Sequence, residues 1–307
     1  MSNLQSKPAT TLTPEVLPAL PFESWKDTLA TLHMWTQIVG KVRLELCPMV
    51  NHYWNVTFYV TARGMTTLTM PCARAGLEAS FDFIDHKLIL ETSDGGSCVL
   101  ALRPQSVADF YQEFMSALND LGVQVKIWTM PQEVPEPIRF EKDRVHASYD
   151  AEAAHEFWRI LLWTDTVFKE FRAGFIGKVS PVHFFWGSFD LAVTRFSARR
   201  APEKPEADKV TREAYSHEVS SAGVWPGGGD ITGPAFYSYA APEPPGFAEW
   251  PVDPKQAFYH PQMKEFLLMY DDVRQAESPK QALMDFLQST YEAAAECGKW
   301  DRKSLER

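Results

Sequence analysis

The feature that most constrains the fold of this chain is an order of helix, strands and helix that occurs twice along its 307 residues. Apolar residues spaced three and four apart predict helices, and alternation of apolar with polar residues predicts strands. The first series covers residues 25–42, 54–60, 77–84, 87–92, 97–102, 106–121 and 123–129. The second covers residues 150–175, 182–196, 215–221, 235–241 and 278–297. Both series indicate antiparallel meanders with helices rather than a doubly wound parallel sheet.

Short motifs also recur in the two series. Gly40-Lys41-Val42 closes the first predicted helix, and Gly177-Lys178-Val179 follows the long helix of the second series. Each motif is followed by a proline, a histidine and a tryptophan: Pro48, His52 and Trp54 in one half, and Pro181, His183 and Trp186 in the other. We interpret this repetition as a duplicated unit. The alternative is a chance match between two amphipathic segments.

The sequence therefore predicts an α+β fold of two similar halves, each an antiparallel sheet flanked by helices, packed as a pseudo-duplicate. Residues 1–20, which are rich in Ser, Thr and Pro, are predicted to form a flexible tail. The first half is expected over residues 21–135 and the second over residues 136–307, because the Pro-rich stretch 131–137 has the composition of a linker. A binding site between the halves, or in one half alone, is compatible with this arrangement.

Composition indicates a large core and argues against two classes of partner. Aromatic residues make up 13% of the chain, and their rings can bury a large apolar area. The net charge of −10 repels phosphate backbones, and the one dense basic stretch, residues 195–204, is interpreted as a solvated loop. We therefore expect no nucleic-acid partner. No apolar run is long enough to span a membrane, so no membrane association is expected.

The cysteines and the N-terminus indicate the cellular compartment. The four cysteines are far apart in sequence and form none of the usual zinc-binding or redox spacings. Free thiols in a reducing compartment fit this pattern. The first 20 residues lack the apolar segment of a signal peptide. The sequence therefore predicts a soluble cytoplasmic protein, and it does not indicate an oligomeric state.

The first candidate cluster lies on the predicted strand 182–196. His183, Trp186, Asp190 and Arg195 combine imidazole, indole, carboxylate and guanidinium groups on or beside one strand. Residues two apart share a face of a strand, but a bulge at Gly187 would exchange the faces downstream. The sequence leaves open whether the side chains of His183 and Asp190 converge.

The second candidate cluster lies on the predicted strand 215–221 and the glycine-rich loop after it. Tyr215, His217 and Ser221 share one predicted face, and Glu218 lies on the other. A histidine beside a carboxylate suits proton transfer, because the imidazole pKa lies near neutrality. The alternative is that His217 forms a structural hydrogen bond and Glu218 meets water. Trp225 begins the glycine-rich loop, which lacks the lysine and hydroxyl residues of a phosphate-binding loop.

A metal site is conceivable but has no motif to support it. His183, His217 and Glu218 offer nitrogen and oxygen ligands on two strands. The spacing H-E-x-x-H is absent, because Val219, Ser220 and Ser221 follow Glu218. We therefore assign no metal ligand, and the sequence identifies no cofactor.

Long segments of the chain resemble an uncharacterised bacterial family, the domain of unknown function numbered 5996, over roughly Pro21 to Arg302. The segments that carry the resemblance are WKDTLATLHMWTQIVGKVRL (25–44), NHYWNVTFYVTARG (51–64), FDFIDHKLILETSDGG (81–96), FIGKVSPVHFFWGSFDLAVTRFS (175–197) and EAYSHEVSSAGVWPGGG (213–229). The resemblance implies no established activity, cofactor or site residue. The functional hypothesis therefore depends on the residues themselves.

The residues support two hypotheses of different classes. The first is an enzyme that acts on a small polar or anionic molecule. In it, His183 and His217 transfer protons and Glu218 or Asp190 orients them. Arg195 holds an anion, and the ligand pocket also contains Trp186, Tyr215, Ser221 and Trp225. The second is a non-catalytic scaffold that binds a ligand or a partner chain in a groove between the halves.

Overall fold

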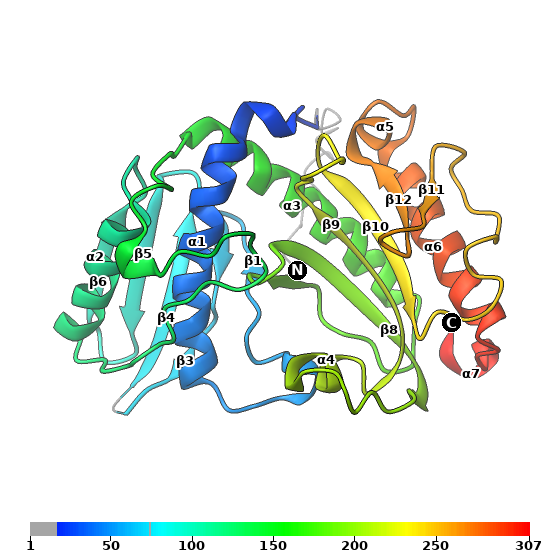
Figure 1. The fold of residues 1–307 in the computed structure, drawn as a ribbon, viewed down its shortest axis with the longest axis horizontal. Coiled ribbons are helices and arrows are strands. Elements are labelled where there is room, and N and C mark those ends of the chain that lie inside the picture. The colour runs from blue at the N-terminus through cyan, green and yellow to red at the C-terminus, as the bar shows by residue number, and fades with distance from the viewer. Residues whose placement is uncertain (1–16, 74) are drawn as a thin grey trace, which may run out of the picture.

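Two antiparallel sheets of six strands each form the centre of the molecule, which confirms the predicted α+β class (Figure 1). The computed structural model describes residues 17–73 and 75–307. The first sheet has the order β1-β2-β4-β5-β6, with β3 also paired to β4. Its strands are β1 (Tyr59–Val60), β2 (Gly64–Thr66), β3 (Met70–Pro71), β4 (Gly76–Asp82), β5 (Lys87–Thr92) and β6 (Ser97–Ala101).

The second sheet is a longer meander with the order β11-β12-β10-β9-β8-β7. Its strands are β7 (His183–Phe185), β8 (Asp190–Arg200), β9 (His217–Trp225), β10 (Ala235–Ala241), β11 (Phe258–His260) and β12 (Glu265–Met269). β8, β9 and β10 are paired along most of their lengths. These three central strands position most of the candidate site.

Each sheet has its own pair of long helices. α1 (Phe22–Leu46) packs with α2 (Val107–Asp120), while α3 (Ala151–Ala173) packs with α6 (Pro279–Cys297). In Figure 1, α1 lies in front of the first sheet and α3 lies behind the second. The remaining helical segments are η1 (Asn51–Tyr53), η2 (Phe140–Lys142), α4 (Lys209–Ala214), α5 (Tyr270–Arg274) and α7 (Arg302–Leu305).

The predicted helix starts agree with the caps in the structure. Ser106 accepts a hydrogen bond from the Asp109 amide, and Asp150 accepts bonds from the first amides of α3. Such side chains satisfy amides that have no partner inside the helix. α6 begins at Pro279, where the missing N–H costs nothing.

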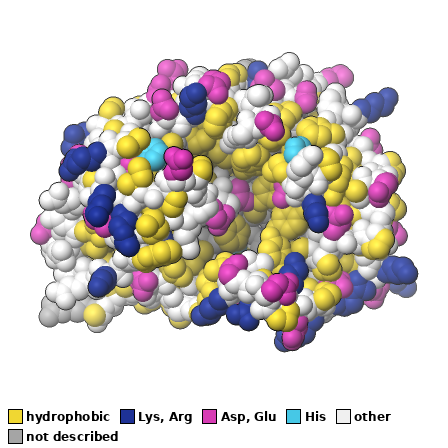
Figure 2. Space-filling model, viewed as in Figure 1, with side chains coloured by type: hydrophobic (Ala, Val, Ile, Leu, Met, Phe, Trp, Pro, Cys, Tyr) yellow, Lys and Arg dark blue, Asp and Glu magenta, His cyan; other side chains and the backbone are white. Residues whose placement is uncertain are grey.

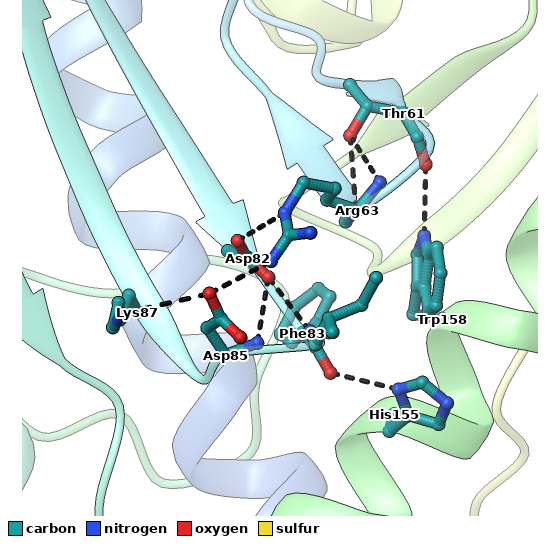
Figure 3. A network of polar contacts seen from close by, with 10 residues as sticks. Thr61, Arg63, Asp82, Phe83, Asp85, Lys87, His155 and Trp158 are labelled. Carbon is teal, nitrogen blue, oxygen red and sulfur yellow. Dashed lines mark hydrogen bonds and ion pairs between the residues drawn. The ribbon is translucent and has the colours of Figure 1, made fainter.

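The two halves are joined by backbone and side-chain contacts. Phe58 and Phe184 exchange two backbone hydrogen bonds of 2.9 Å, one from each half. Beside them, α3 holds the first sheet through the Trp158 indole N–H, which donates to the Thr61 carbonyl, and through the bond between His155 and the Phe83 carbonyl (Figure 3). One hydrophobic core therefore runs through both halves.

The predicted strand 54–60 is mostly wrong. Only Tyr59 and Val60 form a strand, and the residues before them follow the short helical turn η1. His52 and Tyr53 both have left-handed backbone conformations, with φ of 61° and 58°. Trp54, the first residue of the predicted strand, is itself helical, with φ of −67° and ψ of −11°, so the chain is not extended there.

Two further expectations about strands need correction. Residues 123–129, predicted to be a strand, have no regular secondary structure. The predicted strand 182–196 is a hairpin of β7 and β8, because the chain turns at residues 186–189 and Phe189 has a φ of 58°. This turn, and not a bulge, puts the His183 position opposite Ala192 on the next strand.

The short repeated motif does not occupy equivalent places. Gly40 lies inside α1, which continues to Leu46, whereas Gly177 follows the end of α3. The glycine is required at position 40, because a Cβ atom there would come within 2.4 Å of the Trp186 ring. The repetition is therefore one of element order, not of these local motifs.

Three expectations concern the ends of the chain, its cysteines and the membrane. Of the predicted tail 1–20, residues 1–16 lie outside the described residues, and Leu17 and Leu20 are buried. All four cysteines are free thiols. Within residues 17–73 and 75–307, no helix has the length and apolar character needed to cross a bilayer.

Candidate functional site

A pocket of about 760 Å³ lies between the two halves. The first half contributes residues 52–54, 56 and 132–133, together with Leu44, and the second half contributes the face of the β8–β9–β10 sheet and the segment around α4. Figure 2 shows this hollow in the middle of the molecule, with largely hydrophobic walls and acidic side chains near its edge. A pocket of this size accommodates a small organic molecule.

Strand alternation determines which side chains of β8 enter the pocket. Asp190, Ala192, Thr194 and Phe196 line it, whereas Arg195 points to the opposite face, toward α3 and α6. Residues two apart share a face, so these four residues mark the length of the pocket along the strand. On the neighbouring strands the same face carries Val219, Ser221, Tyr237 and Tyr239.

Asp190 lies on the pocket floor and is buried. One of its carboxylate oxygens accepts a hydrogen bond from the Ser188 hydroxyl, and the other accepts one from the Tyr237 hydroxyl. Burial raises the pKa of Asp190, and these two hydrogen bonds oppose the rise. A carboxylate held in this way is oriented by neutral partners, and no described lysine or arginine pairs with it.

Besides Asp208, the N-cap residue of α4, two more carboxyl groups reach the pocket from distant parts of the chain. Glu265 at the start of β12 is half-buried, and Glu133 lies exposed at the rim, against Gly187. Burial, and then the negative charge of Asp190, raises the pKa of Glu265 to about 7. The same two causes raise the pKa of Glu133, because its carboxyl group packs against Gly187 although the residue as a whole is exposed. Among the described residues, neither carboxyl group has a hydrogen-bond or ion-pair partner.

Aromatic side chains form most of the remaining wall. Tyr215 and Tyr239 share a hydrogen bond of 3.1 Å, and Thr194 and Ser221 share one of 2.8 Å. The described lining includes three tryptophans, two phenylalanines and four tyrosines: Trp54, Trp186, Trp225, Phe185, Phe196, Tyr53, Tyr215, Tyr237 and Tyr239. The pocket therefore has a polar, carboxyl-rich floor and an aromatic wall.

The basic end of the pocket, near Phe196, is defined by the lining residue His52 and by its neighbours Lys178 and His217, which do not themselves line the pocket. The Lys178 Nζ atom is 2.6 Å from His52 Nε2 and lies 4.5 Å above the centre of the Phe196 ring. His52 Nδ1 faces the carbonyl oxygens of Glu213 and Ala214, at 3.1 and 3.3 Å. Carbonyls only accept, so Nδ1 carries the proton and Nε2 accepts from the Lys178 ammonium group.

The electrostatics of the basic end agree with this tautomer. Burial, and then the positive charge of Lys178, lowers the pKa of His52. Burial also lowers the pKa of Lys178, while the Glu213 carboxylate opposes that shift. The His217 ring lies 5.6 Å from the His52 ring, and its pKa is lowered by burial, Lys178 and Arg200. The Lys178–His52 pair thus carries one positive charge.

A family profile described as "Family of unknown function (DUF5996)" matches residues 17–307. The chain belongs to this family. No curated protein and no solved structure shows significant similarity to it. Membership in DUF5996 therefore leaves the site geometry as the basis for functional inference.

In this DUF5996 member, the structure brings five of the nine candidate site residues into one pocket. They are Trp186, Asp190, Tyr215, Ser221 and Trp225. His217 lies next to the lining residue His52 at the basic end. The Trp186 indole N–H donates to the Val56 carbonyl at 2.7 Å, so this ring also fixes the wall of the first half.

The other three candidate residues do not line the pocket. Arg195 is buried among the rings of Phe171, Phe175 and Tyr291, and its side chain donates to the Phe171 carbonyl. Glu218 lies on the opposite face of β9, where it pairs with Arg199 at 2.7 Å.

His183 is buried on the pocket side of β7, but it is covered by the rings of Trp54, Tyr59 and Phe185. Burial, followed by the charges of Arg43 and Arg172, lowers its pKa to about 3. His183, His217 and Glu218 therefore do not come together as metal ligands. Within residues 17–73 and 75–307, no group of three or more potential metal-ligating His, Cys, Asp or Glu residues occurs.

Sequence reasoning missed several residues of the pocket. Tyr237 and Tyr239 gave a usable signal, because two tyrosines spaced two apart must lie on one face of the predicted strand 235–241. Glu265 and Glu133 gave none, and His52 and Lys178 were noted only as members of the repeated motif. Their relation to β8 depends on pairings between segments that are far apart in sequence.

Proposed function

We propose that this protein binds a small organic cation in the pocket between its halves. The observation that carries the proposal is the convergence of Asp190, Glu265 and Glu133 on one aromatic cavity whose described lining contains neither lysine nor arginine. A ligand with a positively charged nitrogen would restore the missing charge balance.

The energetics of the pocket favour a positively charged ligand over a negatively charged one. A buried carboxylate is costly unless a cation or strong hydrogen bonds compensate it, and the cost of Asp190 is only partly offset by Ser188 and Tyr237. A bound cation lowers the free energy of every ionised carboxyl group around it. An anion would be repelled by the same groups.

The aromatic wall fits the same ligand class. Cations are attracted to the faces of tryptophan and tyrosine rings, most strongly where water is excluded. The pocket wall includes the rings of Trp54, Trp186 and Trp225. Two tyrosines, Tyr237 and Tyr239, also line the pocket. Ammonium groups that carry methyl or methylene substituents have the mixed polar and apolar surface that such a wall recognises.

The proposal changes one part of the hypothesis drawn from sequence and keeps another. An anionic ligand required Arg195 in the pocket, and that guanidinium group lies on the far side of β8. Acid–base chemistry is the second candidate function, because the pKa of Glu265 is near 7 and its carboxyl group faces the cavity. In that case Glu265, rather than His183 or Glu218, would exchange a proton with the ligand.

Binding of benzyltrimethylammonium, measured by calorimetry, tests the proposal. We expect saturable binding that weakens about ten- to a hundredfold in Asp190→Asn and in Glu265→Gln, because each change removes one carboxylate from the pocket. Glu218→Gln is the matched control, since it removes a carboxylate from the opposite face of β9. Equal affinity in all four proteins, or no binding to the wild type, would contradict the proposal.

A further inference from the structure

The pocket has a second charged end that the proposed cation site does not use. Asp190 and Phe196 are six residues apart on β8, which corresponds to about 20 Å along an extended strand. Asp190 marks the acidic end, and Phe196 marks the basic end defined above. The Phe196 N–H donates to the Lys178 carbonyl at 3.0 Å, which fixes Lys178 at that position.

Lys178 is the charged group of this end, and it retains free hydrogen-bonding capacity. Its ammonium group uses one proton for His52 Nε2 and lies over the rings of Phe196 and Trp54, both of which line the pocket. Among the described residues, no carboxylate lies within 4.0 Å of Lys178 Nζ. The nearby Glu213 carboxylate accepts the backbone N–H of His52 at 3.0 Å.

His52 is built to hold the ammonium group in place. Its ring is buried, and the left-handed backbone at His52 and Tyr53 turns this segment against α4. The Glu213 and Ala214 carbonyls orient Nδ1, so Nε2 faces Lys178. A lysine fixed by a neutral histidine and two aromatic faces is preorganised to bind an anion.

We infer that the ligand of this pocket is a zwitterion: its ammonium group lies at Asp190, Glu265 and Glu133, and its carboxylate or similar anionic group lies at the Lys178–His52 pair. The inference rests on the proposed function, because it adds a second subsite to the cation site. A molecule that carries both charges satisfies both ends at once, whereas a simple cation leaves Lys178 without an anionic partner.

Matched pairs of ligands separate this inference from the proposed function. The probes are ω-(trimethylammonio)alkanoates with chains of increasing length and the methyl esters of the same acids. The ester keeps the cation and the chain but lacks the anion. We expect one chain length at which the acid binds at least about tenfold more tightly than its ester.

Variants of Lys178 assign that preference to the basic end. In Lys178→Met the ratio of the acid's affinity to the ester's affinity should fall to about one, whatever the affinity of the ester itself. Lys178→Arg keeps the positive charge and should retain part of the preference for the acid over its ester. Lys126→Met, which replaces an exposed lysine of the first half, should retain all of that preference. Thermal unfolding shows whether each variant folds. The acid–ester comparison in the wild type does not depend on the variants.

Three outcomes would overturn the inference. If esters bind and acids bind no better at any length, the cation site stands and the anionic subsite does not exist. If the preference for the acid survives in Lys178→Met, the anion is held elsewhere. If neither acids nor esters bind, the proposed function and this inference fail together.

Discussion

At the scale of single residues, Glu265 is a pocket carboxyl group whose ionisation responds to pH near neutrality. Its pKa is raised from 4.5 to about 7, first by burial and then by Asp190. A carboxyl group with a raised pKa favours the folded state only while it is protonated. Its contribution is therefore complete below about pH 4.5 and is lost as the pH rises to about 7.

This residue predicts a pH-dependent difference in stability. Relative to Glu265→Gln, the wild type should lose on the order of 2–3 kcal/mol of unfolding free energy between those two pH values. Urea unfolding of both proteins across this range measures the difference. A difference that stays constant with pH would show that Glu265 titrates normally. Affinity for an organic cation should change in the opposite sense and strengthen as the carboxylate forms.

At the scale of elements, α1 positions the acidic rim of the pocket from a distance. The buried Gln37 amide group donates to the Gln132 carbonyl and accepts from the Gln132 N–H, both at 2.8 Å. The residue that follows, Glu133, has a left-handed backbone conformation with a φ of 54°. The segment that carries Glu133 therefore depends on one side chain of a helix nearly 100 residues earlier in the chain.

Substitution Gln37→Met should release this segment while filling the same space. We expect a loss of about 2–4 kcal/mol of stability, since two backbone groups lose their partners. We also expect faster amide hydrogen exchange around residues 131–134 and weaker cation binding, although Gln37 does not line the pocket. Gln288→Met, on α6, is the matched control, because its amide group bonds only to Glu292 among the described residues. Unchanged exchange at residues 131–134 would show that other contacts position Glu133.

At the scale of the whole molecule, the shared core predicts that the two halves unfold together. Phe58 is fully buried at the junction, where its ring packs with Phe81 of its own half and Phe184 of the other. Phe58→Ala should cost about 3–5 kcal/mol. Hydrogen exchange should show equal loss of protection in the β4–β5 and β8–β9 regions. Two separate transitions, with only the first half destabilised, would contradict this expectation.

How much of the fold could be predicted depended on the range of the interactions involved. Ser106 and Asp150 cap helices through bonds to amides within three residues, so local sequence identified both helix starts. The interruption at residues 186–189 was expected only as a bulge at Gly187, and the turn at His52 was missed, because the left-handed residues Phe189 and His52 are not glycines. Local hydrogen bonds close both turns, such as the one from the Phe189 N–H to the Phe185 carbonyl at 2.8 Å, but no local residue pattern announces them.

By itself, the sequence determined the α+β class, the main helices and the family. Those properties follow from residue spacing and from contacts between neighbours in the chain. Only the tertiary structure decided the charge of the pocket. Glu133, Asp190 and Glu265 come from a linker and two strands, and the order of the sheet determines where they lie. Because sheet order arises from burying a shared core, no local pattern could show that three carboxyl groups meet there without a basic partner.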